Sequence, residues 1–116
     1  MDKRLRAQFY QTPAGNEPVR DWLKSLNKAD RRLIGDDIFT VEAGWPIGMP
    51  TCRPLGDGIF EVRTDLPDGT IARVFFCIED GCMYLLDGFI KKTQKTPQVN
   101  LELSKNRRKE VLNALK

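Results

Sequence analysis

The sequence predicts a single α+β domain spanning residues 1–116, and three observations carry this prediction. The chain has 116 residues, of which 41% are hydrophobic and 30% charged, as expected for one domain with one core. Period-two hydrophobic patterns, typical of strands, occur near the N-terminus and again in the second half, with two helical patterns between them. We therefore expect an N-terminal strand, a two-helix hairpin, an antiparallel three-stranded meander completing one sheet, and a C-terminal helix.

The first strand and the first helix follow from the N-terminal residues. Residues 4–10 alternate apolar and polar side chains, which predicts a half-buried strand that ends at the polar residues 11–15. Asn16 can cap a helix in which Pro18 occupies the first turn, where its missing N–H does no harm. One apolar stripe at helical spacing then follows: Val19, Trp22, Leu23 and Leu26.

The second helical pattern begins after Asn27 and ends at Gly44. So few residues separate it from the first helix that the two should form an antiparallel hairpin. Residues 45–50 contain two prolines and a glycine, which predicts a loop, with Trp45 and Met49 expected at the edge of the core.

Strand patterns separated by short turns fill most of residues 53–90. Residues 54–58 are turn-rich, and strands are predicted over 59–66, 70–78 and 82–90, separated by turn signals at 67–69 and 80–81. The dipeptide Thr96-Pro97 then signals a helix start, which predicts a helix up to about Leu115. Its apolar residues form an interrupted set, so this helix could be partly detached from the core.

The charge distribution narrows the class of partner. Residues 88–116 hold eight lysines and arginines against two glutamates, a net charge of +6. The whole chain carries +3, so residues 1–87 carry −3. A basic end on a weakly acidic body favours a polyanion or an acidic protein as the partner.

Cysteine and histidine usage argues against a metal site. Cys52, Cys77 and Cys82 lack CxxC spacing and the chain has no histidine, so we expect no zinc site, no disulfide framework and no cofactor. Cys77 lies in an apolar strand pattern and should be a small buried hydrophobe. We find no signal-peptide core and no run of membrane-spanning length, so a cytoplasmic protein without a membrane partner is expected.

Two arginines lie inside the predicted meander. If residues 67–69 form a three-residue loop, Leu66 pairs with Thr70 and Arg63 lies opposite Arg73. A two-residue loop would instead move Arg63 to the other face of the sheet. The two arginines either pair with local carboxylates, Glu61, Asp65 or Asp87, or they share an external anion. Because a lysine cluster follows the next strand, we interpret the set as a phosphodiester-binding surface.

Three segments of the chain resemble those of a known family. The matching segments are Leu55 with Gly58-Ile59-Phe60-Glu61-Val62-Arg63, then Arg73-Val74-Phe75-Phe76, then LLDGFIKKTQKTP at residues 85–97. Together with the element order, they resemble the RelE/HigB-like toxins of type II toxin–antitoxin systems, in the phage-derived branch. The resemblance covers essentially the whole chain, and the segment 85–97 is its most specific part.

The resemblance implies a small endoribonuclease that cleaves messenger RNA, often on the translating ribosome. Such toxins act without a metal, by attack of the ribose 2′-hydroxyl on the adjacent phosphate, and a co-encoded antitoxin, commonly with a helix-turn-helix domain, silences them. Arg63 and Arg73 would then be phosphate clamps, and Lys91 or Lys92 would assist proton transfer or bind the RNA backbone. Gln94 and Lys95 would position the RNA.

One departure from the family pattern concerns Asp87, which stands where relatives often have histidine. Asp87 could act as the general base, or it could form an ion pair that fixes Arg73. Tyr84 could stack on a base, assist as an acid, or simply pack. The lack of histidine keeps two rival functions open: a ParE-like inhibitor of DNA gyrase, and an interaction protein that binds an acidic segment of its partner.

Overall fold

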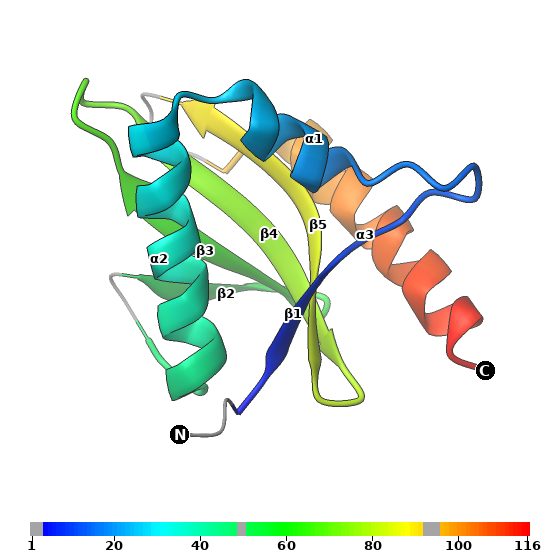
Figure 1. The fold of residues 1–116 in the computed structure, drawn as a ribbon. Coiled ribbons are helices and arrows are strands. Elements are labelled where there is room, and N and C mark those ends of the chain that lie inside the picture. Colours follow the sequence, from blue (N-terminus) through cyan, green and yellow to red (C-terminus); the bar gives the residue numbers. More distant parts are fainter. Residues whose placement is uncertain (1–3, 49–50, 92–95) are drawn as a thin grey trace.

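A five-stranded sheet in the order β1-β5-β4-β3-β2 organises the fold (Figure 1). The computed structural model describes residues 4–48, 51–91 and 96–116. It confirms the expected α+β architecture, with an N-terminal strand, two helices, the sheet and a C-terminal helix. The elements are β1 (Arg6–Phe9), α1 (Pro18–Ser25), α2 (Lys28–Gly44), β2 (Cys52–Gly56), β3 (Ile59–Asp65), β4 (Ile71–Glu79), β5 (Cys82–Lys91) and α3 (Gln98–Ala114).

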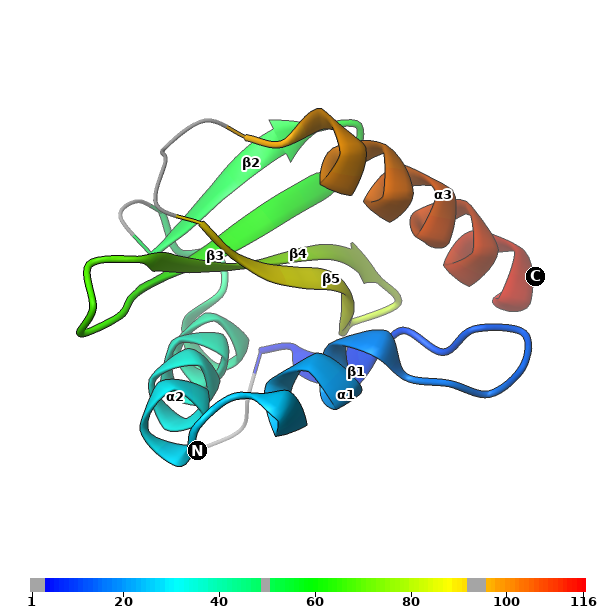
Figure 2. The ribbon, with the colours of Figure 1, turned by 90° about the horizontal axis from the view of Figure 1, so that it is seen from above.

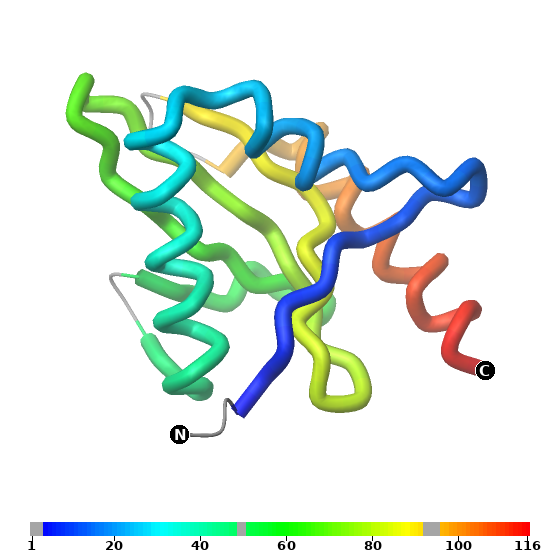
Figure 3. Tube along the Cα trace, viewed as in Figure 1, coloured from blue at the N-terminus to red at the C-terminus, as the bar shows by residue number. Residues whose placement is uncertain are grey.

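The meander contains four strands, one more than the sequence predicted. Strands β2 to β5 pair antiparallel in chain order, and β1 pairs parallel with β5, so the first and last strands lie side by side (Figure 3). The additional strand β2 falls on residues that we assigned mostly to a turn. Its Pro54 is compatible with a strand because β2 lies at the edge of the sheet, where a missing N–H breaks no ladder.

Helices cover both faces of the sheet. Figure 2 shows α1 and α2 on one side and α3 on the other. The larger core lies under α1 and α2 and includes Ile34, Val62, Val74 and Phe76, with Trp45 packed edge-on against Phe60 at 5.0 Å. Met49, the other residue expected at this core edge, lies outside the described residues. The smaller core lies under α3 and consists of Tyr10, Ile59, Phe75, Cys77, Leu86, Leu101 and Val111.

The two N-terminal helices begin where the sequence indicated, but the expected Asn16 cap of α1 is wrong, because Glu17 occupies the cap position and its side chain makes no capping hydrogen bond. Pro18 is the first residue of α1, and the Asn27 side chain caps α2 by accepting a hydrogen bond from the Asp30 backbone N–H at 2.8 Å. Trp22 of α1 packs so closely on the backbone of Gly88 in β5 that any Cβ there would overlap the indole ring. No helix in residues 4–48, 51–91 and 96–116 is long and apolar enough to cross a bilayer.

Helix α3 is docked on the sheet largely through polar contacts, rather than detached from it. Its buried apolar residues are Leu101 and Val111, at the two ends of the helix. Between them, Arg107 donates a 2.7 Å hydrogen bond to the Leu86 carbonyl oxygen and lies over the Tyr10 ring at 5.1 Å. These contacts anchor the polar middle of α3, for which the hydrophobic pattern had predicted little packing.

Both edges of the sheet are modified against further pairing. At the β1 edge, Glu42 accepts a hydrogen bond from the Leu5 N–H with its carbonyl oxygen at 3.0 Å and from the Ala7 N–H with its carboxylate at 2.8 Å. At the other edge, Pro54 removes one backbone donor from β2.

Candidate functional site

The pairing of β3 with β4 places two arginines face to face. The register aligns Arg63 with Arg73, and the Leu66 N–H donates to the Thr70 carbonyl oxygen at 2.9 Å, closing the expected three-residue loop. Gly69 in this loop has φ of 85°, a conformation that glycine adopts without strain. The predicted opposition of Arg63 and Arg73 is therefore confirmed, on the sheet face that α3 partly covers.

A third arginine and one carboxylate complete the group. Arg53 of β2 pairs in register with Glu61 of β3, and its Nε and Nη2 atoms donate to Glu61 Oε2 at 3.4 and 3.3 Å. On the same carboxylate, Arg63 Nε lies 3.5 Å from Oε1 and Arg73 Nη1 lies 3.8 Å from Oε2. We call Arg53, Glu61, Arg63 and Arg73 the arginine cluster. It brings three guanidinium groups onto one carboxylate.

The arginine cluster has a buried floor and an accessible rim. The side chains of Glu61 and Arg73 are fully buried, whereas Arg63 is 18% and Arg53 29% exposed. Burial lowers the pKa of Arg73, the neighbouring Glu61 carboxylate opposes this, and the charges of Arg63 and Arg53 add to it. An incoming anion would therefore meet Arg53 and Arg63 first, with the charge of Arg73 behind them.

Thr96, just before α3, contacts this rim, and Lys91 ends β5 on the same face of the sheet. Lys91, the last residue of β5, pairs with Ile71 and is exposed. Thr96 accepts a hydrogen bond at its Oγ1 from Arg53 Nη2 at 3.1 Å. Lys92, Gln94 and Lys95, the remaining residues of the predicted basic motif, lie outside the described residues, so their expected contacts with RNA stay predictions.

Asp87 contacts α3 rather than Arg73. Asn100 Nδ2 donates to Asp87 Oδ2 at 2.8 Å, and Arg107 Nη1 lies 3.8 Å from Asp87 Oδ1. The alternative in which Asp87 fixes Arg73 by an ion pair is therefore wrong, because α3 supplies the cation. Asp87 pairs with Phe75 of β4, and Phe75 points to the same side of the sheet as Arg73, two residues away. Asp87 therefore shares the sheet face of the arginine cluster.

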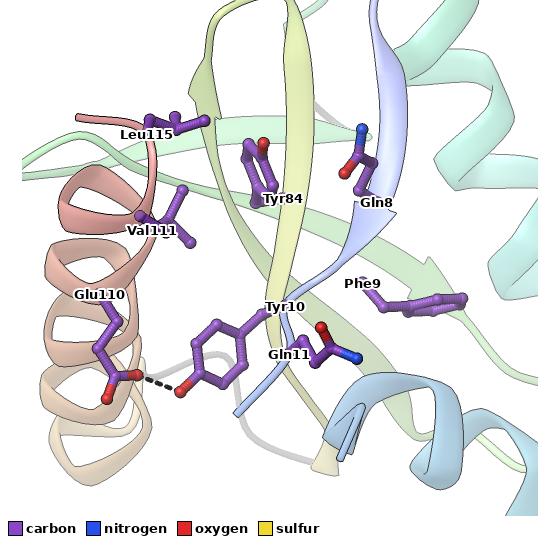
Figure 4. Close-up of a pocket in the computed structure, with 9 residues that line it drawn as sticks. Gln8, Phe9, Tyr10, Gln11, Tyr84, Glu110, Val111 and Leu115 are labelled. Carbon is purple, nitrogen blue, oxygen red and sulfur yellow. Dashed lines mark hydrogen bonds between the residues drawn. The ribbon is translucent and has the colours of Figure 1, made fainter. Parts of the chain in front are cut away.

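Tyr84 lies at the other end of β5, apart from the arginines. It pairs with Cys77, whereas Arg73 pairs with Phe89. Tyr84 lines a pocket of about 230 Å³ between β1 and the C-terminal part of α3. Figure 4 shows the residues that line this pocket, among which Tyr10 donates a hydrogen bond to Glu110. Burial is the largest cause of the raised pKa of Tyr84, and neighbouring Cys82 adds to it. The structure does not bring Tyr84 together with the other predicted site residues.

A polar groove borders the arginine cluster on the side of α2. It has a volume of about 520 Å³, and Arg63 forms part of its wall. Three carboxylates line it and would repel a phosphate, so the accessible side for an anion is the one carrying Arg53 and Lys91. The other lining residues are Leu33, Asp36, Asp37, Thr51, Thr64 and Asp65.

Two members of the cluster had no assigned role in the sequence-based hypothesis. Arg53 was missed because residues 54–58 were interpreted as a turn, and Glu61 was considered only as one of several local ion-pair partners. No local signal marks strand β2, because Pro54 and Gly56 disfavour it, and Arg53 comes to lie beside Glu61 only through the pairing of β2 with β3.

A family model matches the part of the chain that carries the arginine cluster. Residues 21–109, which include the arginine cluster and Asp87, match the family model described as phage-derived protein Gp49-like (DUF891). The chain belongs to this family. The Gp49-like family is associated with the RelE-like toxins of toxin–antitoxin systems. No curated protein matches this Gp49-like chain.

Proposed function

We propose that this Gp49-like protein is the toxin of a type II toxin–antitoxin module and cleaves messenger RNA without a metal ion. The observation that carries the proposal is the convergence of Arg53, Arg63 and Arg73 on one carboxylate. Guanidinium forks match the geometry of phosphate oxygens, and fixed cations stabilise the charge that grows on phosphorus during cleavage.

The proposed reaction starts with attack of the ribose 2′-hydroxyl on the adjacent phosphate. Negative charge accumulates on the phosphate oxygens, and the accessible arginines Arg53 and Arg63 would bind them directly. Arg73, fully buried behind them, would add positive potential without touching the RNA. The 5′-oxygen then leaves with a proton, and the RNA retains a cyclic phosphate.

Proton transfer would fall to residues near the same sheet face. Asp87 is our candidate for the base, because its carboxylate lies on that face and is held by Asn100 and Arg107. Exposed Lys91 at the end of β5 is the candidate for backbone binding or for protonating the leaving oxygen. Lys92, Gln94 and Lys95 would extend the RNA contact. A cognate antitoxin, with or without the ribosome as a further partner, would complete the system.

The absence of histidine favours one other candidate. A chain without the motif histidine could act as a non-catalytic inhibitor of DNA gyrase, like the ParE branch. In that case, the arginine cluster would bind an acidic protein surface rather than RNA.

The deciding experiment is induction of the chain in cells, followed by mapping of messenger RNA ends. The arginine-deficient variant is Arg53→Gln combined with Arg63→Gln, because both side chains reach the surface and their loss should not unfold the domain. Arg20→Gln, in an exposed ion pair with Glu17, is the matched control. New RNA ends with the native chain and with Arg20→Gln, but not with the double variant, support the nuclease. Intact RNA accompanied by DNA damage would refute it and favour gyrase inhibition.

A further inference from the structure

Glu61 is the only carboxylate within ion-pair distance of all three cluster arginines in the described part of the chain. Its contacts with them range from 3.3 to 3.8 Å. Charge-assisted hydrogen bonds in well-matched pairs measure about 2.7–2.9 Å, so Glu61 holds the arginines loosely. A carboxylate can match one guanidinium fork fully, but it cannot match three.

The charges of the cluster explain why a second anion would fit. Three guanidinium groups and one carboxylate sum to a formal charge of +2 in a partly buried setting. Like charges at such short range repel unless an anion lies between them. A phosphodiester undergoing 2′-hydroxyl attack develops a charge near −2, which would neutralise the cluster.

We propose that Glu61 is a positioning residue, an internal counter-ion that holds the three arginines in the protein without bound phosphate and competes with phosphate for them. In this exchange, Arg53 is the arginine that leaves Glu61 and binds the phosphate. Arg53 is suited to this exchange because it is the most exposed of the three and already has a second partner, Thr96. Turning toward a phosphate, it would leave Glu61 to Arg63 and Arg73. The inference rests on the proposed function only in taking the anion to be a phosphodiester.

The competition predicts opposite effects of one substitution on stability and on binding. Glu61→Gln keeps the shape of the side chain and removes its charge. The protein without bound phosphate should lose stability because the three arginines lose the carboxylate that they share. Phosphate should bind about tenfold more tightly, since a negative charge a few Å from its site has been removed.

The test uses the full chain and inorganic phosphate as the probe. Thermal unfolding is followed in sodium phosphate and in sodium chloride of equal ionic strength, and phosphate affinity is measured by calorimetric titration. Phosphate also stabilises proteins by exclusion from their surface, so Glu102→Gln, whose partner Lys105 lies outside the cluster, corrects for this general effect. Glu61→Gln should melt below the native chain in chloride and regain most of the difference in phosphate.

Two outcomes would overturn the inference. Equal losses of Tm for Glu61→Gln in both salts would show that Glu61 has only a structural role. If Glu61→Gln does not fold, the Arg53→Gln variant tests the inference in its place, because it should fold and lose the phosphate-specific stabilisation. Full retention of that stabilisation by Arg53→Gln would refute the exchange. RNA cleavage is scored separately, so a chain that binds phosphate as described but leaves RNA intact would contradict the proposed function alone.

Discussion

Arg63 and Arg73 lie directly opposite each other on β3 and β4, yet Arg63 reaches the surface while Arg73 is completely buried. The Glu61 carboxylate, two residues before Arg63 on the same strand, lies beside both side chains, at 3.5 Å from Arg63 and 3.8 Å from Arg73. It gives the buried cation a partner within the sheet and also contacts the accessible cation. The pair therefore has one structural and one accessible member.

Arg73→Ala should lower the free energy of unfolding by about 3 kcal/mol, since it removes one partner from a buried charge group and leaves a cavity. Urea denaturation measures this loss. Arg20→Ala, which removes a 51% exposed side chain from a surface pair, should change stability by less than about 0.5 kcal/mol. Equal losses for the two variants would show that the buried arrangement of Arg73 contributes nothing.

Two glycine-to-alanine substitutions should change the stability of the protein in opposite directions. Gly88→Ala places a methyl group into the Trp22 ring and should destabilise the protein by roughly 2 kcal/mol, because the core between α1 and β5 is already filled. Gly35→Ala, in the interior of α2 with no atom within 4 Å of the added Cβ, should stabilise it by roughly 0.5–1 kcal/mol through helix propensity. Chemical denaturation of both variants checks the prediction. A stabilised Gly88→Ala would mean that Trp22 moves away freely.

The two ends of α3 offer a matched test of helix docking. Val111→Ala should lower stability by roughly 2 kcal/mol and speed hydrogen exchange throughout α3, because Val111 is one of its few buried apolar anchors. Val99→Ala, at an 81% exposed position on the same helix, should change stability by less than roughly 0.5 kcal/mol and leave hydrogen exchange in α3 at its native rate. If Val111→Ala behaved like Val99→Ala, Leu101 and the polar contacts of α3 would be sufficient to hold the helix.

Alkaline pH should destabilise the protein through two buried thiols. Burial raises the pKa of Cys52 to about 11 and of Cys77 to about 12, from an ordinary value of 9.0. The unfolded chain loses these protons at a lower pH than the folded chain does. The stability that the two neutral thiols contribute is therefore complete below pH 9 and is lost as pH rises through the folded pKa values. Each thiol should contribute a slope of up to about 1.4 kcal/mol per pH unit.

Denaturation curves of Cys77→Ala between pH 8 and 11 test this assignment. The variant should lose stability less steeply with pH than the native chain, whatever its stability at pH 8. An unchanged slope would show that ionisation of Cys77 is not linked to unfolding.

Local patterns in the sequence predicted most of the fold. The limits of α2 follow from Asn27 and Gly44, because they depend on neighbouring residues only. The register of β3 with β4 follows from the loop at residues 67–69 in its three-residue form, one of the two forms that the sequence left open. Strand β2 could not be predicted in the same way. Pro54 and Gly56 disfavour a strand locally, and pairing with β3 supplies the stabilisation.

The candidate site was predictable only in part for the same reason. The opposition of Arg63 and Arg73 follows from a turn, but the place of Arg53 depends on β2 and its pairing. The partner of Asp87 depends on how α3 crosses the sheet, a tertiary contact that the weak hydrophobic pattern of that helix does not specify.

The protected edges of the sheet limit how another protein can bind. Glu42 occupies backbone donors along β1, and Pro54 removes a donor from β2, so neither edge is a good template for strand addition. A partner chain would gain little from extending the sheet with its own backbone. We therefore expect recognition of this protein to depend on side chains that the partner presents to a face, and edge-to-edge aggregation to be disfavoured.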